Sequence, residues 1–387
     1  MNIKVISEEI IKPSSPTPNH LRYLPFSLLD HANKPTLTPL LFFYSQKNDN
    51  NHALARLEDS LPNTLSLFYP LAGRIHDANT FTCNDDGVPY VHAFVNKPLE
   101  DVAHKMDVCD LDRLLPSYGE KGCFTTLLLA IQVNCFSCGG LAIGVKMNHV
   151  ISDAFSLLMF VKTWASMANT GKEDHLTVAD PPLFETWKIF PPPPSPQVKE
   201  KAIHAQADIP VITKWFMFSE AKLNSLQSKL ISFLDTYRKN NNNSMCDYEL
   251  NSKSLGMVLS AFLYSRINVA CHNDYNNQNN VVIPREVLHP VNIRHLVSPI
   301  QENSYYFGNM IVHAIAKPCL VVSKNEDKNY NSLKNEACLL WYDFMKSAEI
   351  SFDNIISKDS SFVSDMKEGK EDLSLMKEHY DRKSKGR

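Results

Sequence analysis

The chain has 387 residues, of which 44% are hydrophobic, and it carries a formal net charge of -3. Its length and apolar content suffice for two domains with buried cores, and its weak charge is untypical of nucleic-acid or anionic-membrane binding. No window approaches the roughly 18 apolar residues of a membrane span, and the N-terminus lacks a signal-peptide core. We therefore expect a cytoplasmic protein with a small-molecule partner, no nucleic acid and no membrane attachment.

The nine cysteines are an odd number without the spacing of a disulfide framework, which favours free thiols in a reducing compartment. Cys135 and Cys138 form a single CxxC at the end of a predicted strand. Because no second CxxC pair accompanies it, we interpret these thiols as buried structural residues and expect no metal site.

In chain order, the first predicted elements are a buried strand over 38–45 and a helix whose apolar face runs from Leu54 to Phe68. Pro62 falls inside this helical pattern, so we expect the helix to be interrupted there and a turn to begin. The segment YPLAGR at 69–74 follows, with Gly73 as the expected stop. We interpret YPLAGR as structural, holding the first domain together.

Three strands are predicted next, over 89–95, 123–136 and 141–149, the last from its alternation of apolar and smaller or polar residues. A helix follows after a short turn. Its expected apolar face consists of Phe155, Leu158, Val161, Trp164 and Ala165.

The composition changes between 169 and 212, where the run FPPPPSP at 190–196 excludes a helix interior or a central strand. We interpret 181–212 as a proline-rich crossover linker. It divides the chain into an N-terminal domain at 1–180 and a C-terminal domain at 213–387.

The C-terminal part restarts the alternation of strands and helices. Strands are predicted over 213–219 and over 305–316, where a glycine breaks the second one. Helices are predicted over 221–237 and about 254–269. A strand that ends in an Asn-x-Arg turn precedes the glycine-broken strand. The chain therefore reads as two α/β halves.

His149 is the candidate catalytic residue, because it lies where a strand pattern gives way to a helix, and such junctions lie at sheet rims where reacting groups are common. Imidazole titrates near neutrality, so it can accept a hydroxyl proton and return one to a leaving group. Asp153 follows four residues later. This spacing is not specific alone, since about one such pair is expected by chance in a chain of this size.

The residues leave other interpretations of this pair open. His149 is also consistent with a core histidine bonded to the backbone. Asp153 is suited to cap the following helix, and a direct Asp153–His149 dyad is a further alternative, although side chains rarely face each other across a short turn.

Five motifs occur in an order and approximate spacing that resemble the plant BAHD acyl-CoA-dependent acyltransferases, whose signature is HxxxD. They are YPLAGR at 69–74, FSCGG at 136–140, NHVISDAFS at 148–156, VNIRHLVSP at 291–299 and YFGN at 306–309. The N-terminal EEIIKPSSPTP, followed by Asp30, is similar to the branch that contains vinorine synthase and related alkaloid acetyltransferases. The resemblance runs from about residue 5 to about residue 350.

The resemblance implies an α/β fold of two similar chloramphenicol-acetyltransferase-like domains, with mixed sheets flanked by helices and a channel between them. It implies that His149 is the general base at the centre of that channel. Asp153 would support the catalytic loop by pairing with Arg294, and Lys253, Ser254 and Asn292 would line the CoA side. Ser254 is equally suited to cap its own helix.

The implied activity is an O-acyltransferase, most simply an acetyltransferase of a plant specialised metabolite such as an alkaloid. The implied partners are acetyl-CoA or another acyl-CoA as co-substrate and a small alcohol as acceptor. No permanently bound cofactor and no metal are expected, and the expected state is a monomer.

The chain departs from the family in lacking the C-terminal Asp-Phe-Gly-Trp-Gly signature and the closing strands that follow it. We therefore expect an incomplete second domain and keep an alternative hypothesis, a truncated non-catalytic relative with a binding or regulatory role. A serine or cysteine hydrolase is disfavoured because the chain has no Gly-x-Ser-x-Gly elbow.

Overall fold

A computed structural model describes residues 1–45, 50–103, 107–118, 125–170, 181–192, 218–228, 259–260, 262–263, 287–294 and 306–316. The chain divides into two compact units. The first unit comprises Met1–Trp215 and Leu296–Met310, and the second comprises Phe216–His295 and Ile311–Arg387. The predicted domain boundaries at 180 and 213 stay a prediction.

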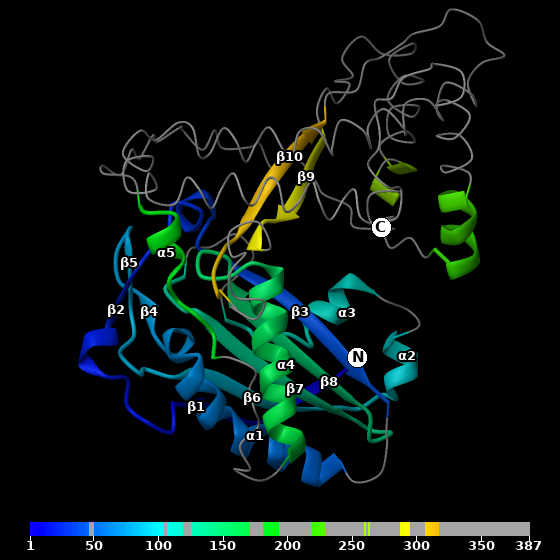
Figure 1. Cartoon of the computed structure of the whole chain (residues 1–387). Helices are drawn as coiled ribbons and strands as arrows, with labels where there is room; N and C mark the ends of the chain where they lie inside the picture. Colours follow the sequence, from blue (N-terminus) through cyan, green and yellow to red (C-terminus); the bar gives the residue numbers. More distant parts are fainter. Residues whose placement is uncertain are drawn as a thin grey trace, which may run out of the picture. The chain divides into compact units, whose positions relative to one another are not determined.

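The first unit is built on a five-stranded mixed sheet with the order β1-β6-β7-β8-β3 (Figure 1). Its strands are β1 (Ile3–Ile11), β6 (Val88–Val95), β7 (Leu129–Phe136), β8 (Leu141–Asn148) and β3 (Leu37–Tyr44). Only β6 and β7 are parallel, and the other neighbours are antiparallel. The central strands β7 and β8 are almost wholly buried, as their apolar sequences predict.

Helices α1 (Asn50–Leu67) and α4 (Ala154–Thr170) pack on one face of this sheet and against each other (Figure 1). The prediction that Pro62 ends the first helix is wrong, because α1 continues through it. Leu61 and Leu65, on either side of Pro62, are fully buried in the main core. This packing offsets the backbone hydrogen bond that proline cannot donate. In the turn of α1 before Pro62, the Leu57 carbonyl accepts a 2.9 Å hydrogen bond from Nε1 of Trp164.

The predicted apolar face of α4 is also wrong, apart from Trp164 and the partly buried Val161, which packs against the main core. Phe155 and Leu158 are 40% and 50% exposed, whereas the buried face consists of Leu157, Phe160, Trp164 and Ala168. Both sets have helical spacing, so periodicity alone does not choose between them. The N-terminal turn of α4 fixes the choice, because contacts described below anchor Asp153 and Ser156.

Two smaller assemblies complete the first unit. Helices α2 (Leu99–Ala103) and α3 (Val108–Asp112) cover a second core cluster, which includes strand residues of β6, β7 and β8. A three-stranded sheet has the order β2-β5-β4, with β2 at Tyr23–Pro25, β5 at Thr80–Thr82 and β4 at Arg74–Ile75.

The YPLAGR segment has the structural role that its sequence indicates. It forms the 3-10 helix η3 (Tyr69–Ala72), which ends at Gly73. A Cβ at Gly73 would lie 2.0 Å from the carbonyl oxygen of Thr82, so the close approach to β5 requires glycine. The Arg74 guanidinium then donates to the carbonyls of Gly73 and Gly87.

In the second unit, β9 (Val287–Asn292) pairs antiparallel with β10 (Ile311–Ala316). This confirms the strand expected to end in the Asn-x-Arg turn, and the part of the predicted 305–316 strand that follows Gly308. Residues 220–228 are helical, which covers the start of the helix predicted over 221–237. Residues 259–260 and 262–263 are helical within the helix predicted over about 254–269. Residues 213–217 and every residue after 316, including the expected site of truncation, lie outside the described residues.

Candidate active site

His149 directly follows β8, and its main chain is held on both sides. Its N–H donates to the Thr36 carbonyl at 2.9 Å, which extends the β3–β8 pairing by one residue. Its own carbonyl accepts a 2.8 Å hydrogen bond from Nδ2 of Asn309. The peptide groups that carry the imidazole therefore have fixed partners from two segments remote in sequence.

Asn148 shapes the turn that begins at His149. Its side chain is fully buried, and its amide donates to the carbonyls of Thr125 and Leu127 at 3.2 Å and 3.0 Å. Its Oδ1 accepts from the N–H of Val150 at 3.1 Å. An amide is suited to this position because it supplies donors and an acceptor together, where the chain leaves the sheet.

The imidazole of His149 is half-buried, and no hydrogen bond to it is found among the residues that the structure describes. Its Nδ1 is the buried nitrogen. The other nitrogen, Nε2, therefore lies on the accessible edge of the ring. A histidine whose main chain is fixed and whose Nε2 is not engaged by the described protein groups is suited to meet a substrate hydroxyl.

Asp153 is buried, caps helix α4 and also accepts a hydrogen bond from the residue that follows the YFGN segment. Its Oδ1 accepts from the N–H of Ser156 at 2.9 Å, as an N-cap of α4 does at its third helical residue. Its Oδ2 accepts from the N–H of Met310 at 3.0 Å. Within the described ranges no hydrogen bond joins Asp153 to His149, so this structure favours the capping interpretation over a direct dyad.

The YFGN segment packs against the start of α4. Oγ of Ser156 accepts from the N–H of Gly308 at 3.0 Å and lies 2.9 Å from the Gly308 carbonyl, to which it donates. Gly308 has a φ of 144°, and a Cβ there would lie 2.9 Å from Thr186 on helix α5 (Thr186–Ile189). A glycine is needed for both the backbone conformation and the close approach.

Asp30, in the 3-10 helix η2 (Asp30–Ala32), lies behind the His149 loop. Its Oδ2 accepts from the N–H and the hydroxyl of Ser27 at 2.8 Å and 2.7 Å. Its Oδ1 accepts from Nδ2 and the N–H of Asn309 at 2.9 Å and 3.3 Å. Burial raises the pKa of Asp30 to about 6, although the hydrogen bonds from Asn309 and Ser27 act in the opposite direction.

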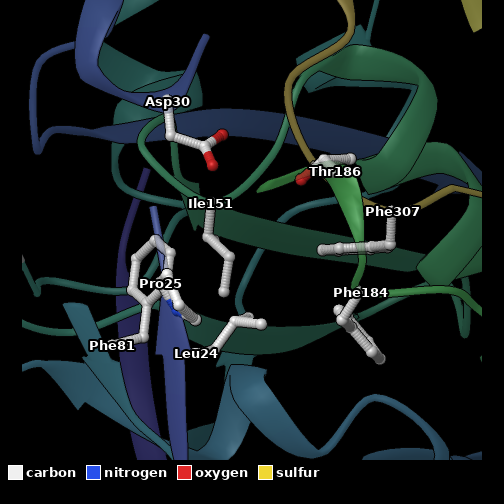
Figure 2. A pocket seen from close by; sticks show the side chains of 9 residues that line it. Leu24, Pro25, Asp30, Phe81, Ile151, Phe184, Thr186 and Phe307 are labelled. Atoms are coloured by element: carbon white, nitrogen blue, oxygen red, sulfur yellow. The ribbon is translucent and has the colours of Figure 1, made fainter. Parts of the chain in front are cut away.

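A small hollow adjoins Asp30, and Figure 2 shows this carboxylate at one end of it, above Ile151. Its other lining residues are mainly apolar: Leu24, Pro25, Phe81, Phe184, Thr186, Phe307 and Gly308. The hollow measures about 10 Å³, the space of one water-sized sphere. It is therefore too small for an acyl-CoA or an alcohol acceptor, and it is not the substrate site.

The other predicted site residues fall in the second unit. Oδ1 of Asn292, at the end of β9, accepts from the N–H and the guanidinium of Arg294 at 3.1 Å and 3.2 Å. The role of Arg294 as partner of Asp153 and that of Asn292 toward CoA stay predictions. Lys253 and Ser254 lie outside the described residues.

The CxxC thiols are free, but the prediction that both are buried is wrong, because Cys135 is only half-buried and Cys138 is exposed. Cys135 Sγ is 3.2 Å from Nε2 of His92, Cys138 Sγ accepts from the N–H of Leu99, and burial raises the pKa of Cys135 to about 11. Among the described residues, no group of three His, Cys, Asp or Glu is placed to hold a metal. No helix in the same ranges is long and apolar enough to cross a membrane.

Sequence reasoning missed the structural roles of Asn148, Ser156 and Asn309. Asn148 and Ser156 lie within the NHVISDAFS motif, and Asn309 ends YFGN. The sequence therefore identified the motifs but not the hydrogen bonds that these three residues make. The signal for Asn309 was a polar residue directly after a glycine between two apolar runs.

The fold is that of the two-domain CoA-dependent acyltransferases. The chain aligns with the crystal structure of vinorine synthase at a TM-score of 0.61 and 25% identity, covering 87% of this chain and 76% of that one. Vinorine synthase from Rauvolfia serpentina is 30% identical over 363 residues, 86% of this chain and 79% of the relative. The predicted fold class is confirmed.

The chain belongs to the Transferase family, the BAHD acyltransferases, because residues 1–335 match that family. Akuammiline synthase 2 from Alstonia scholaris is 31% identical over 82% of this chain and 67% of the relative. Acetyl-CoA-benzylalcohol acetyltransferase from Clarkia breweri is 35% identical over 59% of this chain. The chain spans only 52% of the length of this second relative.

Proposed function

We propose that this protein is an acyl-CoA-dependent O-acyltransferase in which His149 acts as the general base. One observation carries the proposal. The main chain of His149 is held at both its N–H and its carbonyl, while Nε2 lies on the accessible edge of a ring that the described residues leave without a hydrogen bond. This arrangement fits a base that must receive a proton from a bound alcohol.

That geometry supports the following reaction, which the family resemblance implies. Nε2 of His149 takes the hydroxyl proton of the acceptor as the alcohol oxygen bonds to the carbonyl carbon of the thioester. The tetrahedral intermediate then breaks its carbon–sulfur bond, and the proton on Nε2 passes to the leaving CoA thiolate. No covalent bond to the enzyme forms, and the imidazole ends in its starting state.

The proposed acyl donor is acetyl-CoA, and the proposed acceptor is an alcohol among plant specialised metabolites. Family membership and the name of the benzyl alcohol acetyltransferase support this substrate class. An alkaloid acceptor is the more specific proposal, supported by the resemblance of the N-terminal segment to alkaloid acetyltransferases. We further propose a cytoplasmic monomer without a permanently bound cofactor.

In this proposal Asp153 is a positioning residue. It caps α4 and holds Met310, and we propose that it also pairs with Arg294. Asn292, Lys253 and Ser254 are proposed to line the CoA side of the channel, as in the family pattern. A double-mutant cycle between Asp153 and Arg294 tests the pairing, since independent residues give additive free energies of unfolding.

The test of function is the release of free thiol from acetyl-CoA by the purified protein, with a panel of hydroxylated alkaloids, terpenoids and phenolics as acceptors. The His149→Ala protein, measured in parallel, gives the background rate. We expect release with at least one acceptor and an acetylated product by mass spectrometry. If a folded sample releases no thiol with any acceptor, the proposal fails and a non-catalytic relative is favoured.

A further inference from the structure

Three segments remote in sequence meet behind the His149 loop. Asp30 comes from the N-terminal part of the chain, Asn309 from YFGN, and the carbonyls of His149 and Val150 from the turn after β8. Asp30 and Asn309 are 4% and 2% exposed, so their hydrogen bonds are made away from water. All of these groups belong to the first unit.

The orientation of the Asn309 amide is fixed by its surroundings. Nδ2 lies 2.9 Å from Oδ1 of Asp30, 2.8 Å from the His149 carbonyl and 2.9 Å from the Val150 carbonyl. All three neighbours are acceptors and share the two amide hydrogens, so the amide nitrogen, and not Oδ1, must face them. The carboxylate of Asp30 thus selects the orientation in which Asn309 donates to the catalytic loop.

We infer that Asp30 and Asn309 act as a pair of positioning residues that set the location of His149. This inference rests on the proposed function for its kinetic consequences. Asn309 clamps two successive carbonyls, one of them on His149 itself, and Asp30 keeps Asn309 in the donating orientation. Because a displacement of a reacting group by about 1 Å costs on the order of 100-fold in rate, loss of the clamp should lower kcat.

Two single substitutions remove different parts of the pair. Asn309→Ala deletes both bonds to the loop, and we expect kcat to fall by about 100-fold. Asp30→Asn leaves Asn309 in place but turns an acceptor into a possible donor, so a smaller fall of about 10-fold is expected. KM for acetyl-CoA should change by less than about twofold, because both side chains are buried and so are not expected to contact the substrate.

A swapped double variant separates positioning from simple structural support. In Asp30→Asn with Asn309→Asp, the new amide at 30 can still accept from Ser27 and donate to the carboxylate at 309. A carboxylate at 309, however, cannot donate to the carbonyls of His149 and Val150. We expect the swapped variant to be more stable than Asn309→Ala but less stable than wild type. Its kcat should stay as low as that of Asn309→Ala.

Asp85→Asn is the matched control. Asp85 accepts from the N–H and hydroxyl of Thr17 and forms an ion pair with Arg22 in the same unit. Neither partner belongs to the His149 loop. Its loss should lower the melting temperature but leave kcat within about twofold of wild type. Loss of general stability alone would therefore be seen in this control.

A second measurement does not depend on acyl transfer. The rate at which diethyl pyrocarbonate modifies His149, followed by peptide mass spectrometry, reports how tightly the loop is held. We expect a several-fold faster modification in Asn309→Ala and in the swap, and an unchanged rate in Asp85→Asn.

The outcomes decide the inference as follows. If wild type transfers no acyl group, the proposed function fails, and the modification rates alone decide the positioning role. The inference is overturned if Asn309→Ala and Asp30→Asn match wild type in the modification rate. It is also overturned if the swap restores the wild-type kcat and modification rate, or if Asp85→Asn changes them as much as Asn309→Ala.

Discussion

Replacing Asp153 by asparagine should destabilise the first unit. The carboxylate accepts hydrogen bonds at both oxygens, and these include bonds from the N–H groups of Ser156 and Met310. An amide keeps only one acceptor, so its NH₂ group must face one of these buried donors. Losing a hydrogen bond to a charged group costs about 1.5–3 kcal/mol, and losing the charge at a helix N-terminus costs about 0.3–1 kcal/mol more. The expected loss in the free energy of unfolding is therefore about 2–4 kcal/mol.

The assay is urea unfolding followed by tryptophan fluorescence, for which the buried Trp164 of the first unit is a probe. Asp107→Asn is the matched control, because Asp107 caps α3 by accepting from the N–H groups of Cys109 and Asp110 at an exposed site. Asparagine caps helices as well as aspartate does, so this control should change stability by about 0.5 kcal/mol or less.

The activity of Asp153→Asn should fall together with its stability, because the same two hydrogen bonds hold the turn that carries His149. An unfolding midpoint equal to that of wild type, or equal to that of Asp107→Asn, would refute the buried-cap reasoning. A stable variant with normal turnover would refute the positioning role of Asp153.

Two further predictions concern stability. Because the pKa of Asp30 is raised from 3.8 to about 6 in the folded state, its neutral form is favoured by folding, and this contribution is lost as the pH rises through about 6. The destabilisation caused by Asp30→Asn should therefore be largest below pH 3.8 and smaller by about 3 kcal/mol at pH 7, measured by urea unfolding. His31, whose pKa is lowered by burial, is common to both proteins and cancels in the difference; a difference independent of pH would show that Asp30 titrates normally. Gly308→Ala should lower stability by about 1–3 kcal/mol, because alanine is strained at this positive φ and its Cβ meets Thr186, and an unchanged melting temperature would contradict the described geometry.

The sequence predicted the elements of the first unit better than their packing. The alternation over 141–149 gave β8 and the exit at His149, because period-two patterns depend only on local geometry. The buried face of α4 was mispredicted because two apolar stripes share Trp164, and the choice depends on Ser156 and Gly308, which are 152 residues apart. Pro62 was misjudged for a similar reason, since tertiary packing of Leu61 and Leu65 outweighs the local cost of proline.

In the candidate site too, the sequence identified individual residues but not the long-range contacts between them. The motif and the chemistry of imidazole identified His149, and the spacing identified Asp153. The contacts of Asn309 with Asp30 and with the His149 carbonyl join positions 279 and 160 residues apart. Such hydrogen bonds leave no periodic signal in one sequence, so the pair became visible only in the folded structure.

The central claim is that His149 is the base for acyl transfer, and its most direct test is kcat/KM for His149→Ala relative to wild type with acetyl-CoA and an active acceptor. General base catalysis contributes about 100-fold to 10,000-fold, so a fall in that range is predicted, with an unchanged unfolding midpoint. A value within about threefold of wild type would show that another group removes the proton and would contradict the account.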